Sequence, residues 1–122
     1  MTYCSTVPSL AALEKRVHVV DPDLLAPQAL VEYEVPDDLA TGIINIGSMP
    51  SDWATRETHT QQIGDDWLDA GNEVILVVPS VIMPIVSAPD RNVLINHRRE
   101  EVARISIVDV VPFTLDPRLF KM

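Results

Sequence analysis

Two polar side chains stand at positions where the sequence predicts ordered backbone, and both are of types that can do acid–base or hydroxyl chemistry. Ser80 follows the apolar run that ends at Val78, so we expect it at the rigid end of a buried strand, facing a pocket. Glu14 and His18 lie one helical turn apart, a spacing that suits an acid–base pair. The alternatives are a turn serine that caps backbone groups and an ion pair on a helix surface.

The sequence lacks the spaced motifs of common metal and nucleotide sites. HExxH and CxxC are both absent, and GxGxxG and GxxxxGK[ST] are absent as well, which disfavours zinc, Rossmann and P-loop sites. GxSxG is also missing, which disfavours a hydrolase triad built on Ser80. We therefore expect no bound metal, because the remaining candidate ligands do not recur at metal-ligand spacing; they are His59, Asp65, His97 and Glu100.

The charge balance limits the partners of the chain. Eighteen Asp and Glu face nine Lys and Arg among 122 residues, a net charge of −9, so neither nucleic acid nor an anionic membrane is an expected partner. The one cluster of basic residues in the sequence consists of Arg91, Arg98 and Arg99. These side chains either face a phosphate-bearing ligand or belong to a solvated loop. No apolar stretch approaches the ~20 residues of a membrane span. The N-terminus lacks a signal-peptide pattern and Cys4 stands alone, so we expect a cytoplasmic protein.

Two helices are expected. The first runs from about Pro8 to His18, with an apolar stripe formed by leucine and valine side chains, and Glu14 falls on that stripe. A carboxylate on a core-facing stripe is costly unless it is paired, so Glu14 requires a partner. The second helix runs from about Thr60 to Ala70 and ends at Gly71.

The strands are expected to be short because ten prolines divide the chain. The run at 73–78 does not alternate, which indicates a strand buried on both faces. Residues 41–58 are expected to form a long irregular connection, and 112–122 a coil. The prediction is an α+β domain with a small mixed β-sheet and two main helices; its other strands are expected at 30–35, 81–86, 92–95 and 105–111.

Six stretches, in order along nearly the whole chain, resemble the RES domain, a family named for its characteristic Arg, Glu and Ser. They are TYCSTVPSLAALEKRVHV (2–19), LVEYEVPDDL (30–39), TQQIGDDWLDAG (60–71), VILVVPSVIMP (74–84), RNVLINH (91–97) and PFTLDPRLF (112–120). No single stretch is decisive, but six in family order are a specific signal.

The resemblance implies one RES-like domain over 1–122, a fold related to ADP-ribosyltransferases, and a cleft that binds NAD⁺ as substrate. RES proteins are bacterial toxins that consume NAD⁺, and their partners are antitoxins with an Xre-like helix-turn-helix. The resemblance assigns catalysis to Glu14 and Ser80. It assigns contacts with NAD⁺ to Tyr3, Ser5, Asn92 and Arg99.

The chain departs from the family pattern in ways that leave its activity open. The family arginine lies upstream of the tyrosine that Tyr3 matches, so we expect a chain that is N-terminally truncated relative to the family. In addition, Arg99 stands at the position where the family usually has a histidine. One reading is an active NAD⁺ glycohydrolase, phosphorylase or ADP-ribosyltransferase. Another is a catalytically impaired paralogue that binds an antitoxin, and a third is an unrelated small α+β domain. Loss of a strand would expose a sheet edge, which predicts a homodimer.

Overall fold

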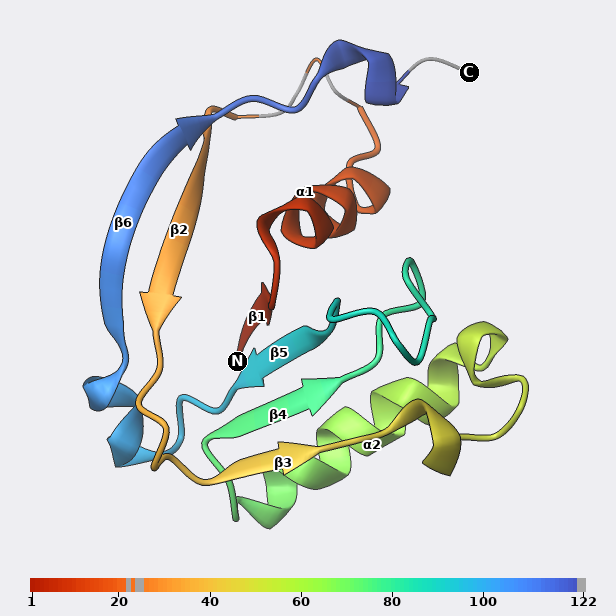
Figure 1. Ribbon diagram of the computed structural model, residues 1–122, viewed down its shortest axis with the longest axis vertical. Coiled ribbons are helices and arrows are strands. Elements are labelled where there is room, and N and C mark those ends of the chain that lie inside the picture. The colour runs from red at the N-terminus through yellow and green to blue at the C-terminus, as the bar shows by residue number, and fades with distance from the viewer. Residues whose placement is uncertain (22, 24–25, 121–122) are drawn as a thin grey trace.

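The computed structural model describes residues 1–21, 23 and 26–120 and divides their strands between two sheets (Figure 1). Four strands form a mixed sheet in the order β1-β5-β4-β3, in which only β3 and β4 are parallel. The other two, β2 and β6, form an antiparallel ribbon that stands apart from this sheet in Figure 1. The helices and strands are β1 (Thr2–Ser5), α1 (Pro8–Val17), β2 (Gln28–Glu34), β3 (Thr41–Ile43), α2 (Glu57–Ala70), β4 (Ile75–Val78), β5 (Asn92–Ile95) and β6 (Ser106–Phe113), with 3₁₀ turns η2 (Ile46–Ser48), η3 (Trp53–Thr55), η4 (Glu100–Arg104) and η5 (Pro117–Phe120).

The core lies on both faces of β4, as its unbroken aliphatic sequence predicts. On one face Ile75 belongs to a buried cluster with Leu39 and Ile95. On the other face Leu76 belongs to a second cluster with Trp67 of α2. Each fully buried aliphatic side chain contributes about 1.5–3 kcal/mol to folding. The first half of β4 is therefore buried on both faces, and this anchors the strand that leads to Ser80.

Both expected helices are present, and the α+β fold class is confirmed. α1 begins at Pro8, whose missing N–H costs nothing at a first helical position, and it buries Leu10 almost completely. α2 begins at Glu57, three residues before the expected start. It ends where Gly71 takes a left-handed conformation with φ of 67°, a backbone geometry that glycine adopts without steric cost.

Three expectations about the connecting segments were wrong. The segment 41–58 is not wholly irregular, because it contains β3, which pairs in parallel with β4. A Cβ at Gly42 of β3 would lie 3.1 Å from Leu76 Cδ1, so glycine is favoured there by close approach rather than by a turn. The strand expected at 81–86 is a loop, which the rigid ring and missing N–H of Pro84 favour. The coil expected from 112 onward instead begins with the end of β6 and includes η5.

The first strand was also unexpected. Residues 2–5 form β1 and pair with β5 over four consecutive positions, from Thr2 opposite Ile95 to Ser5 opposite Asn92. A four-residue segment of mixed polarity carries no periodic signal, so only its pairing with β5 identifies it as a strand. Within the described residues, no helix is long and apolar enough to cross a membrane.

Candidate active site

Glu14, Ser80 and Asn92 meet beside one end of the four-stranded sheet. The Oε1 atom of Glu14 accepts a hydrogen bond from Ser80 Oγ at 2.8 Å and another from Asn92 Nδ2 at 2.9 Å. Glu14 comes from α1, Ser80 from the turn after β4, and Asn92 from the first position of β5. The carboxylate on the apolar stripe of α1 therefore has the partners that its position requires.

The strand register explains why these three side chains converge. Asn92 lies opposite Val78, the last residue of β4, and on its other side lies opposite Ser5, the last residue of β1. Ser5 Oγ donates to Asn92 Oδ1 at 3.3 Å, which directs the amide nitrogen of Asn92 toward Glu14. The amide of Asn92 thus links β1 to α1.

Ser80 is held by burial and by two hydrogen bonds. It is fully buried, with an exposed fraction of 0%. Its Oγ donates to Glu14 and accepts a hydrogen bond from the Ile82 backbone N–H at 3.1 Å. This second contact is the turn-capping role that the sequence offered as an alternative, so Ser80 serves the turn and the Glu14 contact at the same time.

His18 does not pair with the carboxylate of Glu14. Its Nδ1 lies 2.7 Å from the backbone oxygen of Glu14, at the C-terminal end of α1. Neither the acid–base pair nor the helix-surface ion pair suggested by the sequence forms, because the Glu14 side chain turns toward Ser80 and Asn92 instead. Among the described residues, both hydrogen bonds to the Glu14 carboxylate go to Oε1 and none goes to Oε2.

A cavity of about 670 Å³ opens beside Glu14 and Asn92, a volume within the range of small-molecule sites. Its walls come from α1, β1, η3, α2 and the segment after β4, and Ser80 lies behind that wall rather than in it. Tyr3 is 72% exposed and lines the cavity, so its ring is free to stack on a ligand. Thr60 and Gln61 of α2 also line the cavity and were not singled out as site residues from the sequence, although their segment was. Asp65 lines it as well, and the sequence offered that residue only as a candidate metal ligand.

The arginines do not reach this cavity. Arg99 follows the far end of β5 and donates to the Gly71 carbonyl at 2.9 Å and to Glu101 Oε1 at 2.9 Å. The pKa of Glu101 lies below its ordinary value, first through its backbone hydrogen bond and then through Arg99. Arg91 donates to backbone carbonyls of its own loop. Among the described lining residues of the cavity there is no Lys or Arg, so Arg99 lies outside this cavity and its contact with NAD⁺ stays a prediction.

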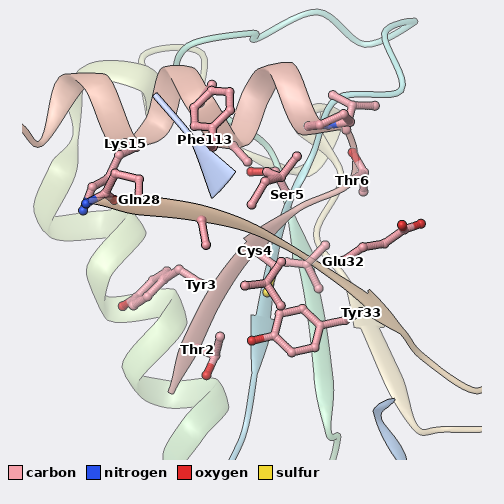
Figure 2. Close-up of a pocket in the computed structure, with 18 of the residues that line it drawn as sticks. Thr2, Tyr3, Cys4, Ser5, Thr6, Lys15, Gln28, Glu32, Tyr33 and Phe113 are labelled. Carbon is pink, nitrogen blue, oxygen red and sulfur yellow. The ribbon is translucent and has the colours of Figure 1, made fainter. Parts of the chain in front are cut away.

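A second cavity, of about 650 Å³, lies between β1, α1 and β2 (Figure 2). Ser5 and Cys4 of β1 line it, as do Gln28 and Tyr33 of β2. Burial raises the pKa of the Cys4 thiol above its ordinary value. Tyr3 lines both cavities, so they adjoin at the start of β1.

Comparison with known proteins identifies relatives over almost the whole chain. The model of the RES domain family matches residues 1–116. A protein named Toxin Res from Photorhabdus laumondii is 36% identical over 122 residues, which are 98% of this chain and 75% of that protein. Toxin Res from Yersinia enterocolitica is 32% identical over 125 residues, 96% of this chain and 76% of that protein. A protein named Prs ADP-ribosylating toxin, from a Sphingobium species, is 30% identical over 125 residues, 99% of this chain and 75% of that protein.

Proposed function

Because the chain belongs to the RES domain family, we propose that it is a toxin enzyme that binds NAD⁺ and breaks the bond between nicotinamide and ribose. The observation that carries the proposal is the carboxylate of Glu14, held by Ser80 and Asn92 at the wall of a cavity of about 670 Å³. The name of the Sphingobium relative supports it, since ADP-ribosylation draws its ADP-ribose from NAD⁺.

The chemistry needs a negative charge that is already in place. When the glycosidic bond breaks, its electron pair leaves with the nicotinamide nitrogen and positive charge develops at the ribose C1′ and ring oxygen. The Oε2 atom of Glu14 stabilises that charge or holds the ribose hydroxyls, because a preorganised charge acts without reorganisation cost. An acceptor then bonds to C1′ and loses a proton; the acceptor is water, phosphate or a protein side chain.

The roles of the neighbouring residues follow from their contacts. Ser80 lies behind the cavity wall and already bonds Glu14 and Ile82, so we assign it as a positioning residue that keeps Oε1 fixed. Asn92 holds the same oxygen and lines the cavity as well. Tyr3 is assigned to stacking on a ring of the substrate.

The test is an NAD⁺-depletion assay on the purified chain. We expect Glu14→Gln to lower turnover by about 10²–10³-fold, the effect of removing a preorganised electrostatic group. The matched control is Glu34→Gln, at an exposed position that ends β2 and lies outside this cavity; it should leave turnover unchanged. Absence of NAD⁺ loss with the native chain, at a concentration where it is folded, would reject the proposal.

A second candidate function is an interaction protein that has kept the fold but binds NAD⁺ weakly. It is favoured by the absence of Lys and Arg from the described lining of the cavity, because the pyrophosphate of NAD⁺ is normally held by guanidinium or ammonium groups. The partner would be an Xre-like helix-turn-helix antitoxin, and the assembly would include a homodimer. Co-purification with such a partner, together with undiminished NAD⁺, would favour this candidate over the enzyme.

A further inference from the structure

The imidazole ring of His18 is oriented by a backbone carbonyl group. His18 directly follows the last residue of α1, and its Nδ1 atom lies 2.7 Å from the backbone oxygen of Glu14. A carbonyl oxygen only accepts hydrogen bonds, so Nδ1 carries a proton and donates it to this contact. A neutral imidazole has a single N–H group. In the neutral ring, Nε2 is therefore unprotonated and has a lone pair that can accept a proton.

The Nε2 atom has no partner among the residues that the structure describes, where the contact of Nδ1 is the one hydrogen bond of this side chain. His18 is exposed and lines the same cavity as Glu14. Side chains four residues apart on a helix lie on one face, with Cβ atoms about 5–6 Å from each other. The carboxylate of Glu14 and a basic nitrogen thus belong to one wall of the cavity, although they do not bond each other.

We propose that His18 is the general base of the reaction and that the acceptor it serves is water. This inference rests on the proposed function, because it assigns the step in which the acceptor bonds to the ribose. The water oxygen bonds to C1′ while one water proton passes to Nε2 of His18. The bond between C1′ and the nicotinamide nitrogen breaks, and its electron pair leaves with nicotinamide. The imidazolium then returns the proton to solvent, so the products are ADP-ribose, nicotinamide and one proton.

The other candidate bases in the cavity wall fit this role less well. They are the carboxylates of Glu14 and Asp65. At neutral pH an imidazole accepts a proton far more readily than a carboxylate does. Glu14 is also assigned to the positive charge on the ribose, which it stabilises only while it stays ionised. Asp65 comes from α2 rather than from the helix that carries Glu14.

A structural role for His18 makes a different prediction. Histidine side chains near the end of a helix often satisfy its last carbonyl groups, and the contact with the Glu14 oxygen is of this kind. If this were the whole role, loss of the ring would weaken the fold and slow every acceptor equally. A general base matters only for an acceptor that must lose a proton, so the choice of acceptor separates the two roles.

The experiment measures nicotinamide release from NAD⁺ with water alone and with added azide. Azide is already an anion and bonds to C1′ without losing a proton. His18→Gln keeps an N–H donor near the Glu14 carbonyl but removes the base. We expect this variant to hydrolyse NAD⁺ about 10²-fold more slowly than the native chain, the usual contribution of a general base. Azide should restore nicotinamide release to within about tenfold of the native rate, with ADP-ribosyl azide as the product seen by mass spectrometry.

Two further variants are the controls. His59→Gln replaces a histidine of α2 that lies outside the described lining of the cavity, and it should leave hydrolysis unchanged. Glu14→Gln should not be rescued by azide, because its defect lies in cleavage of the glycosidic bond rather than in activation of the acceptor. Urea unfolding of each variant establishes that it is folded.

Nitrogen NMR of the chain with labelled histidine tests the geometry without turnover. We expect the neutral ring of His18 to carry its proton on Nδ1, and a proton on Nε2 instead would overturn the proposal. So would undiminished hydrolysis by folded His18→Gln, or a loss that azide does not bypass. A loss bypassed by azide in Asp65→Asn but not in His18→Gln would move the role to Asp65. If the native chain releases no nicotinamide at all, the proposed function fails, and this inference fails with it.

Discussion

The contact between Ser80 and Glu14 can be tested without any assumption about function. Ser80→Ala removes the bond to the Glu14 carboxylate and leaves the Ile82 N–H without its acceptor. A hydrogen bond to a charged group contributes about 1.5–3 kcal/mol, and an unsatisfied buried donor costs about 1–3 kcal/mol. Because the two terms overlap, we expect the free energy of unfolding to fall by about 2–4 kcal/mol, a large fraction of the stability of a small domain.

A double-mutant cycle separates the pairwise contact from the rest. Urea unfolding is measured for the native chain, Glu14→Ala, Ser80→Ala and the double variant, and we expect a coupling energy of about 1–2 kcal/mol. Ser9→Ala, at an exposed position on α1, is the control and should change the free energy of unfolding by less than about 0.5 kcal/mol. If the two substitutions are additive within about 0.5 kcal/mol, the carboxylate and the hydroxyl do not interact in solution and the site geometry is wrong.

Other predictions concern the fold around the site. Gly71→Ala should lower the free energy of unfolding by about 1–2 kcal/mol because φ is 67° there, whereas Gly64→Ala inside α2 should raise it by about 0.5–1 kcal/mol; urea unfolding measures both. Iodoacetamide should alkylate Cys4 only at higher pH than a free cysteine peptide, because burial raises the pKa of its thiol above the ordinary value. The contribution of the un-ionised Cys4 thiol to the free energy of unfolding is complete below the ordinary cysteine pKa. This contribution is lost as pH rises through the raised pKa of the folded state. Arg16→Ala should speed proteolysis at η5, since Arg16 donates to a backbone oxygen of η5 at 2.8 Å. Val110→Lys, at an exposed position of β6, should reduce light scattering at high concentration without changing the unfolding midpoint.

The elements with strong local signals were predictable from sequence, and those defined by pairing were not. α1, α2 and β4 carry apolar periodicity or an unbroken aliphatic run, and Gly71 marks the end of α2. β1 and β3 are short segments of mixed composition that become strands only because β5 and β4 offer them edges. Neither the division into two sheets nor the exposed apolar surface of β6 has a local signature in the sequence.

The candidate site, too, was predictable where local sequence decides it and not where strand pairing does. The position of Glu14 on the apolar stripe predicts that its carboxylate has a partner, and Ser80 at the end of β4 is one of the two partners found. The identity of those partners depends on the antiparallel register that sets Asn92 beside the end of β4, which no local pattern encodes. Arg99 lies four residues beyond β5, and the turn after that strand carries it toward Gly71 and away from Asn92.

The two cavities are connected by a short chain of polar contacts. Ser5 lines the cavity between β1 and β2 and donates to Asn92, which lines the other cavity and donates to Glu14. The antiparallel pairing of β1 with β5 fixes Ser5 opposite Asn92, and so restricts the motion of the Asn92 amide and of the carboxylate that it holds. The pairing of β1 with β5 therefore bears on the preorganisation of Glu14, since electrostatic stabilisation depends on a carboxylate that does not have to move.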